Sequence, residues 1–146
     1  MTQAISVEQA VQMMVAQKAY FADELQAHVD EMSPDPILPV MLMCDFARRM
    51  VAEGKQEFIG VLPFIERLLV EGDEPTRAAI ATGFVETLVS AVDRGDAALA
   101  DINPTLGIKT REYWNAWDKF TRGPNAAALA SPAKPGRSWR EKFLGR

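Results

Sequence analysis

Residues 58–92, FIGVLPFIERLLVEGDEPTRAAIATGFVETLVSAV, decide the fold of this chain. Apolar side chains recur at three- and four-residue steps on both sides of Gly72-Asp73-Glu74-Pro75, a spacing typical of amphipathic helices. In this joint Gly72 can take the left-handed conformation that ends a helix, Asp73 can cap the next helix, and Pro75 already has a helical φ. Because the connection is short, the stretch predicts two antiparallel helices that lie side by side.

The N-terminal segment predicts one long helix over residues 7–32. Ser6 and Gln9 form a capping box at its start, and residues before Ser33-Pro34 avoid the α region, which ends it. Lys18 falls on the apolar side, where its stem can lie along the core while the ammonium reaches water. The apolar stripe consists of Val7, Val11, Met14, Phe21, Leu25, Val29 and Met32.

Two further helices are predicted before the central joint. One begins with Pro39, which suits a first helical turn, and stops at Gly54. The other covers residues 56–71, with Ile59 widening its apolar face. Pro63 lies inside this second pattern and is expected to bend the helix or split it into two pieces.

The helix predicted over residues 75–92 contains Gly83, which costs about 1 kcal/mol of helix propensity relative to alanine. Close approach of a neighbouring backbone is the compensation that we expect there. After turn residues and a short helix expected at 97–102, a last helix is predicted from Thr110, as its cap, to Phe120. This helix carries aromatic side chains at helical spacing: Tyr113, Trp114, Trp117 and Phe120.

Residues 124–146 differ in composition from residues 1–123, which we interpret as a single helical domain. The tail is rich in proline, alanine and glycine, and most of it is expected to be extended or mobile. Near its end Ser138 and Glu141 form a second capping box, which predicts a short terminal helix that can dock back onto the body. The apolar residues of that helix are Trp139, Phe143 and Leu144.

Together these segments predict an all-α fold. The expected architecture is an irregular bundle of five or six helices around a HEAT-like central antiparallel helix pair. No second copy of that pair aligns at a fixed period, so the sequence does not predict a solenoid.

The composition is that of a globular protein, with 146 residues, 48% hydrophobic and 25% charged. The net charge of −4 is uneven: residues 124–146 carry five basic and one acidic residue (+4), whereas residues 1–123 carry 11 basic and 19 acidic residues (−8). An acidic body repels nucleic acid and anionic lipid and favours a basic protein partner, although acidic surfaces also serve solubility alone. Neither a secretory signal nor a membrane-spanning stretch is evident, so we expect a cytoplasmic protein.

Few residues in this sequence can carry chemistry. His28 and Cys44 are the only histidine and cysteine, and they lack metal-ligand spacing, so no metal site is expected. Cys44 lies on an apolar helix face, where a thiol acts as a small hydrophobe. Glu24 is spaced to orient His28, but such pairs arise often by chance, and a surface or boundary histidine is the more ordinary interpretation. With nucleotide-binding and nucleophile motifs absent, the sequence predicts neither an enzyme nor a cofactor.

The aromatic helix has two interpretations. Its rings alternate with basic residues and could stack bases beside cations, as in single-strand binding proteins. The acidic body argues against this, and tryptophans three residues apart usually close a helical core, so we favour core packing. If one ring is exposed, a protein-binding hot spot becomes the better interpretation. The interleaved basic residues are Lys109, Arg111, Lys119 and Arg122.

Two segments carry a resemblance to known proteins. Residues 64–89 contain an apolar helix, a Gly-Asp-Glu turn and a second helix with a Phe-x-Glu-x-Leu ending, through Gly72, Asp73, Glu74, Ala81, Phe84, Glu86 and Leu88. Residues 106–123 contain a second pattern, formed by Leu106, Gly107, Thr110, Arg111, Tyr113, Trp117, Phe120 and Gly123. Both resemble small all-helical bacterial proteins that often serve as immunity proteins of polymorphic toxin systems. The patterns cover about a third of the chain and are mainly structural, and the basic tail lies outside them.

The resemblance implies a protein that binds one cognate toxin and occludes its active site or substrate groove, without catalysis of its own. Many such toxins act on nucleic acids or nucleotides and need a basic cleft to bind them. An acidic surface can imitate the negative charge of that substrate. We therefore expect a basic toxin partner, such as a nuclease or nucleotide-acting enzyme, and no binding to nucleic acid or membrane. The predicted contact residues, placed at the ends of the central helices, are Glu71, Asp73, Glu74, Asp93, Asp96 and Asp101.

Two alternatives stay open on the sequence alone. The chain can instead be a helical adaptor or scaffold module without a toxin partner, including a homodimer that uses the aromatic helix. It can also be an enzyme that uses Glu24 and His28.

Overall fold

The computed structural model describes residues 3–95 and 102–122, with only the backbone of residues 120–122. These residues are helical apart from their connections, and the predicted all-α bundle of five or six helices is confirmed. The helix predicted at 97–102 and the terminal helix of the tail fall on residues outside this description. In chain order the elements are α1 (Val7–Gln17), α2 (Ala19–Met32), α3 (Pro39–Glu53), α4 (Gln56–Glu71), α5 (Glu74–Ala79), the π-helical η1 (Ile80–Val85), α6 (Glu86–Asp93), the 3₁₀ turn η3 (Asn103–Thr105) and α7 (Ile108–Arg122).

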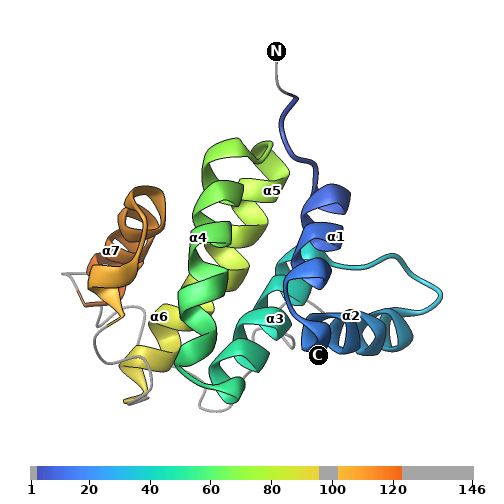
Figure 1. Ribbon diagram of the computed structural model, residues 1–146, viewed down its shortest axis with the longest axis horizontal. Helices are drawn as coiled ribbons and strands as arrows, with labels where there is room; N and C mark the ends of the chain where they lie inside the picture. The colour runs from blue at the N-terminus through green and yellow to red at the C-terminus, as the bar shows by residue number, and fades with distance from the viewer. Residues whose placement is uncertain (1–2, 96–101, 123–146) are drawn as a thin grey trace.

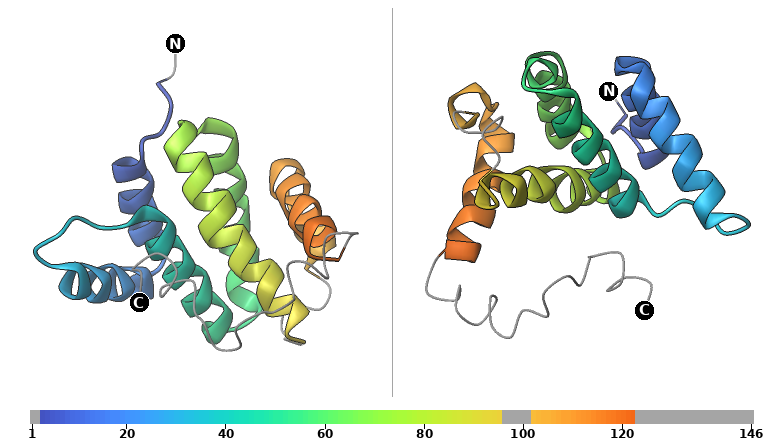
Figure 2. Two further views of the ribbon diagram at one scale, coloured as in Figure 1. Left: turned by 180° about the vertical axis from the view of Figure 1, so that it is seen from behind. Right: turned by 90° about the horizontal axis from the view of Figure 1, so that it is seen from below.

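The central helices lie side by side and antiparallel, as predicted (Figure 1). From behind, α5, η1 and α6 form one continuous helix (Figure 2). α3 lies between this centre and the pair α1 and α2, and α7 covers the opposite side (Figure 1). The largest side chains of the buried core come from all the long helices except α7: Met14, Phe21, Met41, Leu42, Met43, Phe46, Met50, Ile65, Leu68, Ile80, Phe84 and Leu88.

The turn between α4 and α5 confirms the predicted cap and corrects the role of Gly72. The side chain of Asp73 accepts the N–H of Thr76 at 2.9 Å, as an N-cap does. Gly72 is extended, with φ −70° and ψ 153°, so the predicted left-handed conformation is wrong. A Cβ at Gly72 would instead collide with the Leu68 carbonyl oxygen and the Thr76 methyl group. Ile5 pairs with Gly72 in an isolated parallel β-bridge, which ties the N-terminal segment to this turn.

The single helix predicted over residues 7–32 is wrong, because the chain breaks at Lys18. This residue has φ −146° and ψ 136°, which separates α1 from α2. The break resets the helical phase, so that His28 is buried (1% exposed) and Val29 faces outward (39% exposed). No glycine or proline lies near Lys18, so the cause of the break is tertiary: Lys18 pairs with Glu57 of α4.

The boundaries of α3 and α4 agree with the predictions, but two details of α4 do not. Gly54 ends α3 with a φ of 119°, a conformation that favours glycine. α4 continues unbroken through Pro63, so of the two predicted effects, a bend or a split, the split is wrong. Pro63 has no N–H, so the carbonyl of Ile59 lacks its helix hydrogen bond. Both residues are exposed, and water can therefore bond to this carbonyl. Ile59 is 71% exposed and therefore does not widen the apolar face.

Gly83 provides the close backbone approach that the sequence predicted. It lies in η1, against the first turns of α3, and α3 makes its most extensive contact with this segment. A Cβ on Gly83 would lie 2.6 Å from the Val40 carbonyl oxygen and 2.8 Å from the Cβ of Met43. Its carbonyl accepts the Cys44 thiol at 3.4 Å and the Thr87 hydroxyl at 2.6 Å.

We predict opposite effects for alanine at two helical glycines. Gly83→Ala should lower the free energy of unfolding by about 1–3 kcal/mol, because the facing backbone of α3 must shift to admit the Cβ. Gly60→Ala, in α4, should raise it by about 0.5–1 kcal/mol, since open space surrounds this glycine and alanine favours the helix. Urea unfolding measures both, and a shift of the same sign in the two variants would contradict the role of Gly83.

Candidate functional site

The acidic residues predicted to contact a partner lie at two ends of the central helices. Glu71, Asp73 and Glu74 surround the turn between α4 and α5, whereas Asp93 ends α6. With 1.5 Å per helical residue, the two ends are roughly 30 Å apart, so these residues do not form one patch. Asp96 and Asp101 lie outside the described residues.

Two residues at the α4–α5 end already have structural partners. Arg67 donates to Glu71 at 3.1 Å. Hydrogen bonds from Thr76 hold the pKa of Asp73 below its usual value. Glu74 is exposed at the first turn of α5, where a negative charge is favoured by the helix dipole. Structural roles therefore account for the acidic residues at this end of the bundle.

A second acidic surface, which the sequence analysis did not single out, lies on α2 and the loop after it. No lysine or arginine occurs between Lys18 and Arg48. Asp23, Asp30 and Glu31 share one exposed side of α2, and the loop adds the exposed Asp35. Their spacing of seven and eight residues was a signal that could have shown this. We name these four residues the acidic face.

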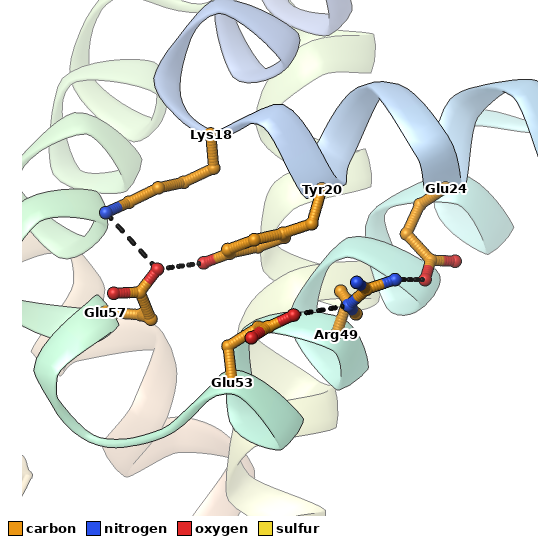
Figure 3. A network of polar contacts seen from close by, with 6 residues as sticks. All are labelled: Lys18, Tyr20, Glu24, Arg49, Glu53 and Glu57. Carbon is orange, nitrogen blue, oxygen red and sulfur yellow. Dashed lines mark hydrogen bonds and ion pairs between the residues drawn. The ribbon is translucent and has the colours of Figure 1, made fainter.

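A polar network fastens α2 to its neighbours and explains the break at Lys18 (Figure 3). The Lys18 ammonium lies 3.3 Å from the Glu57 carboxylate at the start of α4. The Tyr20 hydroxyl donates to the same oxygen at 2.9 Å. Burial above all, then the hydrogen bond to Glu57, raise the pKa of Tyr20 far above its ordinary value. The phenol therefore stays protonated and donates its proton to the hydrogen bond with Glu57.

The other half of the network centres on Arg49 of α3 (Figure 3). Its guanidinium donates to Glu53 at 2.8 Å and to Glu24 of α2 at 3.2 Å. It also lies 5.5 Å from the ring centroid of Tyr20, a cation–π distance. Glu24 thus binds an arginine on the neighbouring helix, which leaves the network with a structural role.

The only histidine and the only cysteine are both buried. The predicted surface or boundary position of His28 is wrong: its Nε2 accepts the Leu38 N–H at 3.0 Å, and its Nδ1 lies 3.7 Å from Asp45. Cys44 is buried against η1, as expected for a small hydrophobe, and burial raises the pKa of its thiol. Both groups serve packing between helices.

α7 is capped by Glu66 of α4, which corrects the predicted cap at Thr110. The Glu66 carboxylate accepts the N–H of Lys109 at 3.0 Å, the N–H of Thr110 at 2.8 Å and the Thr110 hydroxyl at 2.9 Å. The carboxylate fills the space that a side chain on Gly107 would need. Partial burial raises the pKa of Glu66, but the hydrogen bonds from Thr110 and Lys109 outweigh it, and the pKa lies below its usual value.

An apolar groove lies between η1 and α7. It has a volume of about 380 Å³ and is lined by Ala81, Thr82, Tyr113, Ala116 and Trp117. The Trp117 indole donates to the Ala81 carbonyl at 3.3 Å, which fixes the ring in the wall. Trp114 is buried (5% exposed), so core packing is confirmed for that ring. Tyr113 and Trp117 are half-buried and pack against the core, so neither is the exposed ring on which the hot-spot interpretation depended.

Comparison with known proteins places the chain in a family. Residues 14–122 match the model described as Domain of unknown function (DUF7674). The chain belongs to this family. The DUF7674 match contains all of α2 to α7, and therefore both the acidic face and the groove. No curated protein and no solved structure matches the chain.

Two other kinds of feature, a metal site and a membrane span, are absent from the described part of the DUF7674 chain. Across residues 3–95 and 102–122, no group of three or more His, Cys, Asp or Glu side chains is arranged to hold a metal ion. Within the same residues, no helix combines the length and the apolar character needed to cross a bilayer.

We predict that the Glu66 cap makes the stability of the DUF7674 domain depend on pH. Because the folded pKa of Glu66 is lowered, its contribution is complete above the ordinary value of 4.5 and is lost as the pH falls through the folded value. Glu66→Gln should cost about 1–3 kcal/mol at neutral pH, as expected for a charged hydrogen-bond acceptor, and should flatten the stability profile below pH 5.

The matched control is Glu112→Gln, which removes the same charge from the exposed side of α7. It should change the free energy of unfolding by less than about 0.5 kcal/mol. Urea unfolding at several pH values measures both variants. Equal losses in the two variants would show that the removal of one negative charge, and not the loss of the cap, sets the effect.

Proposed function

We propose that this DUF7674 protein is an immunity-type protein of a bacterial polymorphic toxin system. It acts as a cytoplasmic helical module that binds one basic protein toxin and occludes its active site or substrate groove. The resemblance of residues 64–89 and 106–123 motivates this assignment, and the observation that carries it is the acidic face of α2.

The acidic face suits a basic partner for electrostatic reasons. Its four residues are exposed, and α2 lies at the edge of the bundle, where it packs mainly against α1 and α3 (Figures 1 and 2). The neighbouring bases Lys18 and Arg49 are engaged by Glu57, Glu24 and Glu53 on the inner side. A one-sign surface of this kind accelerates association with an oppositely charged protein and imitates the charge of a nucleic-acid or nucleotide substrate.

The groups that could support catalysis have structural roles instead, which favours a binding function over the enzyme alternative. The Nε2 of His28 is engaged by the N–H of Leu38, and the Cys44 thiol is buried against Gly83. Glu24, the proposed partner of His28 in an enzyme, binds Arg49. None of these side chains opens onto the groove between η1 and α7.

The experiment that tests the proposal is affinity capture from the native host with the full chain as bait. We expect a single stoichiometric basic protein, identified by mass spectrometry, whose retention weakens modestly between low and moderate salt. That protein should lose its toxic activity when the chain is added. Recovery of several unrelated proteins, or of the bait alone, would contradict the immunity assignment and favour the adaptor or the homodimer.

We predict that charge reversal on the acidic face slows association with that partner. The variant Asp23→Lys, Asp30→Lys, Glu31→Lys should lower the association rate constant by about 10- to 100-fold at low salt and flatten its salt dependence. The matched control reverses three acids at the helix ends, Glu71→Lys, Glu74→Lys and Asp93→Lys. Stopped-flow association measures both. A larger loss in the second variant would place the contact at the originally predicted residues, and unchanged rates in both would exclude steering by these acids.

A further inference from the structure

The groove between η1 and α7 has the chemistry of a site for apolar side chains. Its volume of about 380 Å³ lies within the range of ligand pockets. The indole N–H of Trp117 is directed to the Ala81 carbonyl, so the ring presents carbon to the groove. Ala81 and Ala116 contribute methyl groups, and Tyr113 contributes a second half-buried ring. Aromatic side chains are the occupants that such a surface favours, because two or more rings pack with favourable edge and face contacts.

The same chain contains a segment of matching character. Residues 138–144, SWREKFL, include Trp139 and Phe143, whose four-residue spacing would place them on one side of the helix predicted there, with Leu144 beside them. The remaining positions are charged or polar and suit the solvent side. Elsewhere in this tail, which is rich in proline, alanine and glycine, Leu129 is the one other large apolar residue.

We propose that residues 138–144 dock into this groove, with Trp139 and Phe143 against Tyr113 and Trp117. The groove is thus covered by a segment of its own chain. The inference goes beyond the proposed immunity function and does not depend on it, because the acidic face lies on the other side of the bundle.

The geometry of the chain permits this contact. α7 ends at Arg122, about one turn beyond Trp117, so the segment that leaves α7 starts beside the groove. Fifteen residues, 123–137, connect it to the docking segment. A chain of that length has a root-mean-square span of about 20 Å when it behaves as a coil, so the docking segment can return to a groove that lies beside the start of the connection. Tethering over such a span gives an effective concentration in the millimolar range, which favours the chain's own segment over a second copy.

Charge also favours the body as the docking surface. The tail carries a net charge of +4 and residues 1–123 carry −8. Glu86 lies one turn beyond Thr82, on the same side of the helix that forms one wall of the groove. Arg140 and Lys142 lie between Trp139 and Phe143 in the sequence, and the net negative charge of the body favours their approach while the rings enter the groove.

Paramagnetic relaxation in the full-length chain tests the proposal. A nitroxide is attached to a cysteine introduced as Gly145→Cys; the native Cys44 is buried, and mass spectrometry verifies that only the new thiol is labelled. We expect the label to broaden most of the signal of the Trp117 indole and of the Ala116 amide. A control sample mixes chains that carry the nitroxide but no ¹⁵N with ¹⁵N chains that carry no nitroxide. It should show no such broadening, because the contact is intramolecular.

Three results would overturn the proposal. No broadening at the groove would show that the segment does not dock there. Broadening confined to the acidic face of α2 would show that charge alone places the tail. Broadening that appears in the mixed sample would assign the groove to a second copy of the chain.

Two surface variants distinguish docking in the groove from a general effect of added positive charge. Ala116→Arg places a long cation in the groove and should abolish the broadening of the Trp117 indole. Ala27→Arg makes the same charge change at an exposed site on α2 and should leave it intact. Equal effects of the two variants would contradict docking by apolar contact.

Discussion

The close approach of α3 to η1 at Gly83 is the contact on which the rest of the bundle depends. With a hydrogen in place of a side chain, the glycine admits the Val40 carbonyl and Met43 at distances that no Cβ allows. The approach also brings the Cys44 thiol to the Gly83 carbonyl, so a polar atom of the core is satisfied by the same contact. Because α3 is fixed on the central helix in this way, α1 and α2 can cover its other side.

The outer helices are attached to this centre by two carboxylates of α4. Glu57 holds Lys18 and Tyr20 at the junction of α1 and α2. Glu66 caps α7, and in doing so it sets the position of Tyr113 and Trp117, which form a wall of the groove. α4 therefore acts as an anchor on both sides, and each anchor joins residues that are far apart in the chain.

These attachments leave two surfaces of different character on opposite sides of the DUF7674 domain. The acidic face belongs to α2 and is charged, which suits rapid association with a basic protein. The groove belongs to η1 and α7 and is apolar, which suits aromatic side chains. The sequence indicated the acidity of the body and the aromatic helix. It did not indicate which acids share a surface, because the predicted residues Glu74 and Asp93 lie at opposite ends of one long helix.

The sequence by itself determined the features that act within a few residues. Proline and glycine end α2 and α3, Asp73 caps α5, and Gly83 marks a close approach, because these effects belong to the backbone chemistry of single residues. Only the tertiary structure decided the break at Lys18, the burial of His28 and the cap of α7. Each of these depends on a partner from another segment, such as Glu57 or Glu66, and no local pattern specifies how such a partner is placed in space.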